Sequence, residues 1–280
     1  MNDSYKYRFG KTVYDLNART YIMGILNVTP DSFSDGGKYL KEEDAIAHAK
    51  QMEADGADFI DIGGQSSRPG ADEISTEEEL KRVIPVLIKL SKEIQIPISI
   101  DTFNSTVAEE ALKNGACIVN DITAFNHDAN MPKVIAKYKA SCVLMHMKGT
   151  SKTMQDKPEY DNLINEILSY LEKAIWKANV EGIDQIIVDP GFGFGKNEEH
   201  NLRLLKGINE FKKLDCPVML GVSRKSTIGK ILNVDVSDRI EGSIALNSIA
   251  ILNGVNILRV HDVTENVRAA RVIDAYKKLK

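Results

Sequence analysis

The sequence predicts an α/β protein in which eight strand-helix units form a (β/α)8 TIM barrel behind a short N-terminal hairpin. Eight short, nearly continuous apolar runs are each followed by a helical pattern, as expected for a parallel sheet buried on both faces. The units occupy about 250 residues, a typical length for this barrel. No flexible linker or change in composition interrupts them, so residues 1–280 are expected to form a single domain.

The predicted elements follow one another in a regular order. A hairpin is expected over residues 5–17, where Gly10 and Lys11 separate two arms rich in Tyr, Val and Phe. Strands are expected at residues 21–26, 59–62, 98–100, 118–119, 142–145, 186–188, 218–220 and 257–260. Helices are expected at residues 42–55, 75–93, 105–114, from about 131, 161–179, 199–211, 239–252 and 263–279. Ser75, followed three residues later by Glu78, is a capping box, and Gly56 ends the first helix.

Polar residues or glycines recur where the predicted strands end. They are Asn27, the Gly63-Gly64 loop, Asp101, Asn120, His146, Asp189, Lys225 and Arg259. In a barrel these positions converge on one face, where such enzymes have their active sites. In a doubly wound open sheet, which is the alternative architecture, they would spread along an edge. Their regular recurrence favours the barrel.

Composition excludes several classes of function. The 40 acidic and 36 basic side chains are interspersed and give a net charge of -4, which argues against broad binding to nucleic acid or an anionic membrane. The N-terminus lacks the apolar core of a signal peptide, and no apolar run is long enough to span a bilayer. Cys117, Cys142 and Cys216 show no C-x-x-C spacing and are expected to be buried reduced thiols. A soluble cytoplasmic protein is expected.

Two loops rich in Gly, Ser and Pro follow the first two barrel strands. Residues 27–37 have the sequence NVTPDSFSDGG, and residues 63–73 have the sequence GGQSSRPGADE. The first loop offers oxygen atoms and backbone freedom but little apolar surface to bury. A loop of this length in a compact domain is more often a binding loop or lid than a plain connection, so a functional role is the favoured interpretation for it.

Two carboxylates and an amide form the first group of candidate ligands. Asp101 and Asp189 directly follow apolar runs, which places each carboxylate where it needs a partner or a ligand. For either residue alone, capping of the following helix is an equally good interpretation. Together with Asn120, they suit the edge of a heteroaromatic ring that carries N–H and C=O groups.

Arg68, Arg259 and His261 are the cationic candidates. Arg259 and His261 are two residues apart on the last strand, so their side chains leave the same face and could form part of an anion site. The alternative is that Arg259 pairs with a carboxylate in the core. His146 is interpreted as a positioned structural histidine, because no metal ligand stands at a suitable spacing.

Two common catalytic motifs are rejected. The GFGFGK segment that ends at Lys196 looks like a phosphate-binding loop. However, Pro190 stands where that motif needs its first glycine, and no Ser or Thr follows the lysine. The chain has no G-x-S-x-G elbow either, which leaves a nucleophilic triad without support.

Seven segments taken together resemble the dihydropteroate synthase family, in order and over nearly the whole chain: MGILNVTPDSFSDGG, DIGGQSSRPGA, SIDT, VND, DPGFGFGK, GVSRKS and LRVHDV. The resemblance implies a transferase that condenses 6-hydroxymethyl-7,8-dihydropterin diphosphate with 4-aminobenzoate to give 7,8-dihydropteroate and pyrophosphate. This is a step of folate biosynthesis in which sulfonamides compete with 4-aminobenzoate. It also implies the TIM barrel, a Mg2+ cofactor and a homodimer.

The resemblance assigns a role to each matching position. It implies that the pterin is held by Asp101, Asn120, Asp189 and Lys225. It implies that the diphosphate is held by Arg68, Arg259 and His261, with the hydroxyl of Ser67 facing it, and that Asn27 is a ligand of Mg2+. It places 4-aminobenzoate between Phe33 and Pro69, with its carboxylate at Ser226.

The second loop departs from the family pattern ESTRPG. Gln65 stands in place of Glu and loses a charge, and Ser67 stands in place of Thr and loses a methyl group. Two alternatives therefore remain open at this stage. One is a pterin-binding methyltransferase domain, and the other is a non-catalytic pterin-binding paralogue.

Overall fold

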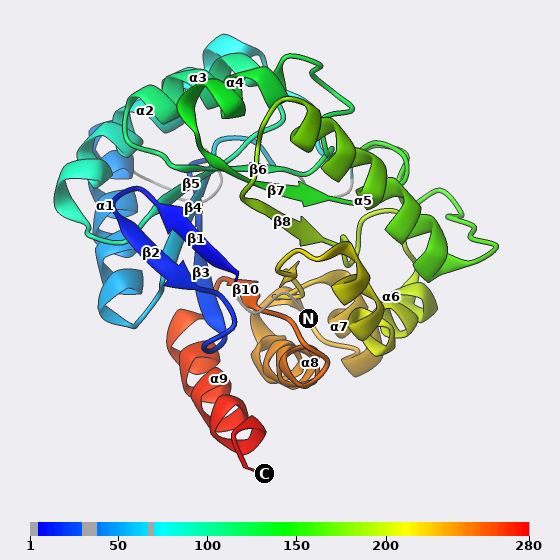
Figure 1. Ribbon diagram of the computed structural model, residues 1–280. Helices are drawn as coiled ribbons and strands as arrows, with labels where there is room; N and C mark the ends of the chain where they lie inside the picture. The colour runs from blue at the N-terminus through cyan, green and yellow to red at the C-terminus, as the bar shows by residue number, and fades with distance from the viewer. Residues whose placement is uncertain (1–4, 30–37, 67–69, 280) are drawn as a thin grey trace.

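The computed structural model describes residues 5–29, 38–66 and 70–279 and contains a closed parallel barrel (Figure 1). The eight barrel strands are β3 (Tyr21–Asn27), β4 (Phe59–Gly63), β5 (Ile98–Asp101), β6 (Ile118–Asp121), β7 (Ser141–Met145), β8 (Ile186–Asp189), β9 (Met219–Leu220) and β10 (Ile257–Val260). They are hydrogen-bonded in the order β8-β7-β6-β5-β4-β3-β10-β9. A parallel bridge between Val188 and Val218 joins the two ends of this order. The predicted barrel is confirmed, and the open-sheet alternative is wrong.

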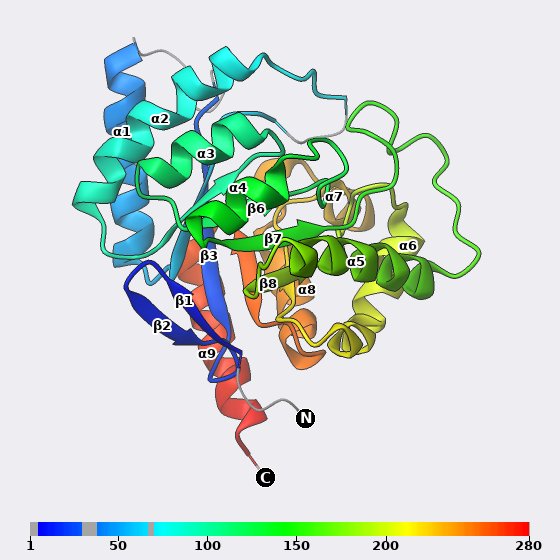
Figure 2. The same cartoon turned by 45° about the horizontal axis from the view of Figure 1, so that its top comes forward.

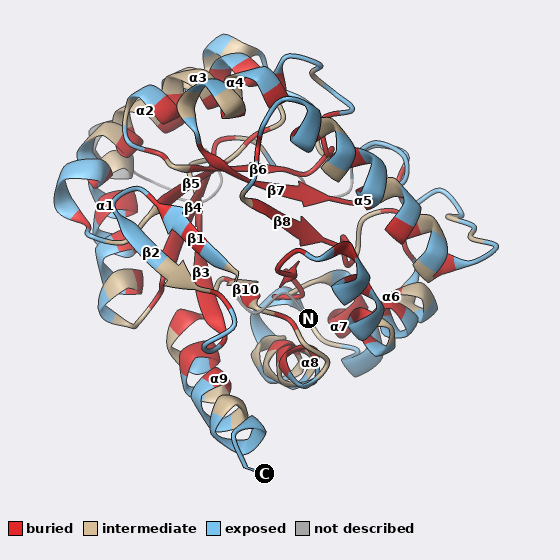
Figure 3. Cartoon of the chain, in the orientation of Figure 1, coloured by how far each residue is buried: buried red, intermediate tan, exposed pale blue. Residues whose placement is uncertain are grey.

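Helices surround the strands on the outside. They are α1 (Lys38–Ala54), α2 (Thr76–Glu93), α3 (Ser105–Lys113), α4 (Met131–Tyr138), α5 (Leu163–Val180), α6 (Glu198–Lys206), α7 (Ser226–Leu232), α8 (Ile240–Leu252) and α9 (Val263–Lys277). Their inner faces are buried and their outer faces are exposed (Figure 3). Ser75 caps α2 as predicted, because its side chain accepts a hydrogen bond from the backbone N–H of Glu78.

The helix predicted over residues 199–211 is shorter than expected. α6 ends at Lys206, and the chain continues as a 3-10 helix, η2 (Ile208–Leu214). The backbone N–H of Gly207 closes the last turn on the carbonyl groups of Arg203 and Leu204. A Cβ at this position would lie 2.6 Å from the terminal methyl group of Ile164 on α5, which would have to move to admit a side chain. A second 3-10 helix, η3 (Val236–Asp238), lies between α7 and α8.

The N-terminal hairpin closes the end of the barrel at which the strands begin (Figure 2). Its strands are β1 (Lys6–Phe9) and β2 (Thr12–Asp15). The Tyr7 hydroxyl donates a hydrogen bond of 2.9 Å to the carbonyl of Ile186, at the start of β8. The ring of Phe9 lies 5.1 Å, between centroids, from that of Phe59 at the start of β4. This end is therefore filled with apolar side chains, which leaves the opposite end for polar chemistry.

Two further expectations concern the thiols and the membrane. Cys142 and Cys216 are buried free thiols, as predicted, whereas Cys117 is only half-buried. Among the residues that the structure describes, no helix is long and apolar enough to cross a membrane.

Candidate active site at the barrel mouth

Strand register brings the polar residues predicted from the sequence to one end of the barrel. Asp101 on β5 is paired in register with Asn120 on β6 and with Gly63 on β4. Asn27 ends β3 opposite the same Gly63. A side chain at position 63 would come within 3.7 Å of Asp101 Oδ2 and 3.9 Å of Asn27 Oδ1. The carboxylate and the amide oxygen therefore flank one open position of the mouth.

Arg259 on β10 reaches across the mouth to two carboxylates. Its Nε lies 2.6 Å from Asp61 Oδ2, and its Nη2 lies 2.7 Å from Asp101 Oδ2. Asn120 Nδ2 donates to the same Asp61 oxygen over 2.9 Å. The sequence alternative that Arg259 pairs with a core carboxylate is therefore confirmed. One guanidinium thus serves two carboxylates, whose remaining lone pairs can accept N–H donors from a ligand.

Asp61 is the site residue that sequence reasoning missed. It lies in the middle of β4, between Ile60 and Ile62, and is fully buried. A charged residue inside an apolar strand needs a buried partner, and this signal was available in the sequence. Asp61 Oδ1 and Asn120 Oδ1 have no hydrogen-bond partner within the described part of the chain. They are acceptors that a ligand or an ordered water can satisfy.

Asp189 and Lys225 form a second ionisable pair on the other side of the mouth. Asp189 ends β8, and its Oδ1 accepts a 2.7 Å hydrogen bond from the backbone N–H of Gly191. Lys225 directly precedes α7 and donates from Nζ to the carbonyl of Phe192. Its Nζ also lies 4.5 Å from the ring centroid of Phe194, a cation-π distance. The loop after β8 therefore supports both residues.

Burial shifts the titration of this site toward neutral pH. Burial raises the pKa of Asp101 to about 7, reinforced by the negative charge of Asp61 and opposed by Arg259. Burial also lowers the pKa of Lys225 to about 8, and the Asp189 carboxylate opposes that shift. Burial also raises the pKa of Asp189. The nearby cations oppose this shift, and Lys225 has the largest effect among them. Buried groups that titrate near pH 7 are typical of functional sites.

The remaining predicted residues are placed less completely. His261 Nδ1 lies 3.0 Å from the Ser223 hydroxyl, two residues before Lys225. Ser226 is exposed as the first residue of α7, and the N-cap position belongs to Lys225, so the alternative that Ser226 caps this helix is wrong. Four predicted residues lie outside the described part of the chain: Phe33, Ser67, Arg68 and Pro69.

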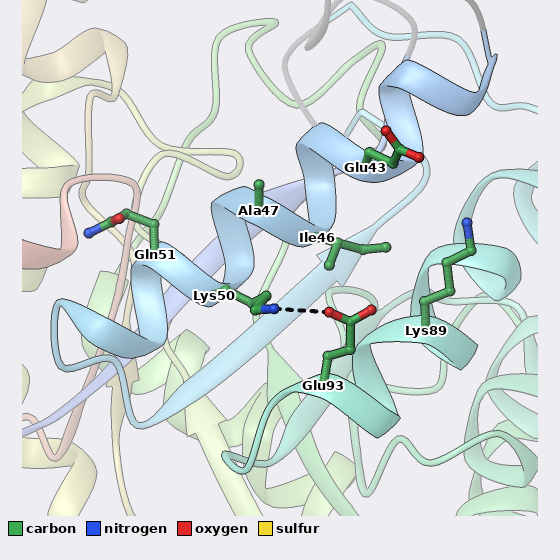
Figure 4. Close-up of a pocket in the computed structure, with 7 residues that line it drawn as sticks. All are labelled: Glu43, Ile46, Ala47, Lys50, Gln51, Lys89 and Glu93. Atoms are coloured by element: carbon green, nitrogen blue, oxygen red, sulfur yellow. Dashed lines mark hydrogen bonds and ion pairs between the residues drawn. The ribbon is translucent and has the colours of Figure 1, made fainter.

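A groove of about 720 Å³ lies on the outside of the barrel between α1 and α2 (Figure 4). Its lysines are paired with glutamates. Lys50 Nζ lies 3.1 Å from Glu93 Oε2, and Lys89 Nζ lies 2.8 Å from Glu42 Oε2. None of the residues predicted to act on a ligand lines it. The candidate chemistry therefore stays at the barrel mouth.

Comparison with known proteins identifies the family of this chain. The family described as pterin binding enzyme matches residues 23–261, which extend from β3 to the end of the last barrel strand. A dihydropteroate synthase of Clostridium beijerinckii is 46% identical over 270 residues, which cover 95% of this chain and 98% of the relative. The chain belongs to the dihydropteroate synthase family. It is accordingly an enzyme of the transferase class.

Solved structures of dihydropteroate synthases share the whole fold. The Yersinia pestis enzyme in a sulfonamide drug complex has a TM-score of 0.93 and 41% identity, covering 98% of this chain and 100% of that one. The Xanthomonas albilineans enzyme with 4-aminobenzoic acid has a TM-score of 0.92 and 39% identity, covering 99% and 100%. These comparisons favour the synthase over the methyltransferase alternative.

Proposed function

We propose that the barrel mouth condenses 6-hydroxymethyl-7,8-dihydropterin diphosphate with 4-aminobenzoate to give 7,8-dihydropteroate and pyrophosphate. The observation that carries the proposal is the polar ring at the mouth, in which ionisable acceptors, amide groups and the Arg259 guanidinium converge above an apolar barrel floor. A pterin ring requires such a mixture of donors and acceptors at its edge and apolar or cationic groups at its faces. Binding of 4-aminobenzoic acid by a relative of the same fold supports the second substrate.

The pterin would lie between the two ionisable groups of the mouth. Asp189 would accept N–H donors of the aminopyrimidine, and Lys225 would donate to ring acceptors. Asp101 and Asn120 would contact the opposite edge, where Asn120 Oδ1 still has acceptor capacity in the described structure. Asp101 already contacts Arg259 in the absence of ligand. Pterin binding would therefore replace or share this contact.

The diphosphate would be held by Arg68, Arg259 and His261, with Ser67 facing it. Asn27 would hold Mg2+ through its amide oxygen. The donor set fits this ion, because Mg2+ binds oxygen ligands and commonly takes only one or two from the protein, with water and substrate phosphates supplying the others. No cluster of three or more His, Cys, Asp or Glu side chains that could hold a metal occurs among the described residues. The ion would supply positive charge to the diphosphate.

The expected reaction is a dissociative substitution at the pterin methylene carbon. The C–O bond to the diphosphate breaks, and its electron pair leaves with pyrophosphate. The ring delocalises the positive charge left on the methylene carbon. The neutral amine of 4-aminobenzoate then attacks this carbon, which forms the C–N bond, and loses a proton. The protein's largest contribution would be to stabilise the departing negative charge with Arg259 and its neighbours.

Pyrophosphate release measured with both substrates tests the proposal. The chain should release pyrophosphate only when the pterin diphosphate and 4-aminobenzoate are both present, and removal of Mg2+ by a chelator should reduce the rate. A sulfonamide should compete with 4-aminobenzoate. No turnover, together with retained pterin binding, would instead support the non-catalytic paralogue that Gln65 and Ser67 leave open.

The carboxylate of 4-aminobenzoate is expected at Ser226. The side chain is exposed and is adjacent to Lys225 in the chain. The free backbone N–H groups of the first helical turn provide additional donors. Ser226→Ala should raise KM for 4-aminobenzoate by roughly tenfold, the loss of about one hydrogen bond to a charged group, and leave KM for the pterin diphosphate unchanged. Steady-state kinetics with each substrate varied in turn decides this, and equal effects on both KM values would place the carboxylate elsewhere.

We also propose that the chain acts as a homodimer through α7, α8 and α9. Large exposed apolar side chains gather on these helices and on η3: Ile231 (54% exposed), Leu232 (47%), Val236 (52%), Ile249 (44%), Leu252 (47%), Val272 (68%) and Tyr276 (64%). Large apolar side chains exposed on neighbouring helices are a feature that protein-protein contacts commonly bury.

Val272→Glu should shift the sedimenting species from twice 31.1 kDa to 31.1 kDa, because the new carboxylate would be buried without a partner. Val180→Glu, on the exposed face of α5, is the matched control and should sediment like wild type. A dimer that survives Val272→Glu would place the interface on another surface.

A further inference from the structure

The lysine that ends the GFGFGK segment is buried beneath the mouth. Lys196 is 1% exposed, although lysine is rarely buried to this extent without partners. The proposed reaction assigns it no contact with substrate. This burial supports the rejection of the phosphate-loop interpretation, because a buried amine is not available to bind phosphate from solution.

Three acceptors surround the Lys196 amine. Its Nζ lies 2.8 Å from the carbonyl oxygen of Gly191, 3.1 Å from that of Phe194 and 2.9 Å from Nδ1 of His146. The two carbonyl oxygens can only accept, so the amine donates to both, and the ring nitrogen of His146 is its third partner. Burial is the main influence that lowers the pKa of Lys196, and the Asp189 carboxylate opposes it.

His146 is a fixed partner for this amine. Its backbone N–H donates to the carbonyl of Asp189, and its ring stands edge-on to Tyr170 at 4.8 Å between centroids. Burial, reinforced by the charge of Lys196, lowers the pKa of His146 to about 2. The ring is therefore neutral at physiological pH and can accept at Nδ1. This is the positioned structural histidine that the sequence predicted.

The backbone held by Lys196 is the backbone that supports Asp189. Gly191 accepts from Lys196 through its carbonyl and donates to Asp189 Oδ1 through its N–H. Its φ of 72° lies in the left-handed region, and a Cβ here would overlap the carbonyl oxygen of His146. The peptide groups on either side of Gly191 thus have no room to move independently of the Lys196 and His146 contacts.

The same loop supports Lys225. The carbonyl of Phe192 accepts from Lys225 Nζ, and the ring of Phe194 lies below that ammonium group. Phe194 is held in turn through its carbonyl by Lys196. One buried amine therefore fixes the loop from inside, while Lys225 and Asp189 contact the same loop from the mouth.

We propose that Lys196, with His146 as its acceptor, is a positioning residue that sets the side chains of Asp189 and Lys225 for the pterin. The role in pterin binding rests on the function proposed above. Lys196 acts only through the loop of residues 190–196 and does not touch the substrate. Replacing Lys196 with an apolar residue of similar length should loosen the contacts of this loop with Asp189 and with Lys225. The barrel strands should stay in place.

The first test uses ligand-free protein and needs no activity. Reductive methylation followed by mass spectrometry measures how readily the Lys225 amine reacts. In Lys196→Met, labelling of Lys225 should rise by about fivefold or more, because the loop opens locally. Lys206→Met removes an exposed lysine of the neighbouring helix α6 and should leave Lys225 labelling unchanged. If Lys196→Met fails to fold, His146→Phe removes a single acceptor and should change labelling in the same direction.

The second test measures the dissociation constant of 6-hydroxymethyl-7,8-dihydropterin by calorimetry. Lys196→Met should weaken binding by about tenfold or more. In a Lys225→Met background the same substitution should have a smaller effect, because part of its action passes through Lys225. A loss that merely reflects lower stability would be equal in both backgrounds.

Unchanged Lys225 labelling in a folded variant overturns the inference. Increased labelling with an unchanged dissociation constant also overturns it, because the loop would then not govern ligand binding. If wild type does not bind the pterin at all, the proposed function fails, and the labelling result alone still decides whether Lys196 positions Lys225.

Discussion

Replacing Arg259 by alanine is expected to lower kcat/KM by about 100-fold, or roughly 3 kcal/mol of transition-state stabilisation. The reason is that a multiply charged leaving group must be neutralised while its bond to the pterin methylene carbon breaks. Arg259 reaches from β10 to the carboxylates of Asp61 on β4 and Asp101 on β5, which holds its guanidinium at the mouth. Pyrophosphate release measured at several concentrations of the pterin diphosphate gives this value.

The structure adds an expected effect on stability. Arg259→Ala leaves the fully buried Asp61 carboxylate without its charged partner, and breaking a buried pair in this way costs about 3–5 kcal/mol. Chemical denaturation should therefore show a lower free energy of unfolding for this variant. Activity has to be measured under conditions in which the variant is folded, so that the loss reflects chemistry.

Arg19 provides a matched control for the loss of an arginine-carboxylate pair. It pairs with Asp58 at the opposite end of the barrel, where its Nη1 donates over 3.0 Å to Asp58 Oδ2. Arg19→Ala should lower stability by less, because Arg19 is about half exposed, and should leave kcat/KM unchanged. If Arg259→Ala stays within about twofold of wild type in kcat/KM, the arginine has only a structural role.

Most of the fold follows from patterns that are local in the sequence. Short apolar runs that end at a polar residue mark each strand, because a parallel barrel strand is buried on both faces until it reaches the mouth. The break at Gly207 was missed because the apolar spacing of Leu204, Ile208 and Phe211 continues through it. This spacing does not distinguish one long α-helix from an α-helix followed by a 3-10 helix.

The site was predicted less completely than the fold. Asp101, Asn120, Asp189 and Arg259 stand at or near strand ends, where a search for polar residues finds them. Asp61 and Lys196 are buried below the strand ends, and their partners are distant in the sequence. Asp61 contacts Arg259, which is 198 residues away, and Lys196 contacts His146, which is 50 residues away. Their roles follow only from the strand register and the path of the loop.

The second large effect is expected at Asp189, whose replacement by asparagine should weaken pterin binding by about 2 kcal/mol, or roughly 30-fold. Asp189 is 4% exposed, and its carboxylate faces Lys225, Lys196 and Arg259, which favour the ionised form against the effect of burial. An amide at this position would remove the negative charge from among these cations. It would also change the hydrogen-bonding pattern that is presented to the ligand.

The direction of that change follows from the Gly191 contact. The backbone N–H of Gly191 donates to Oδ1 of Asp189, so an amide would keep its oxygen on Gly191 and turn its NH2 group toward the mouth. There a donor would meet the N–H donors of the aminopyrimidine edge, and leaving such groups unpaired costs more than one ordinary hydrogen bond.

Asp121→Asn is the matched control. Asp121 is a buried carboxylate at the end of β6 whose oxygens accept from the backbone N–H groups of Thr123 and Phe125, so its replacement should lower stability much more than pterin affinity. Calorimetric titration of both variants with the pterin decides the question, and equal affinities for Asp189→Asn and wild type would show that Asp189 is structural.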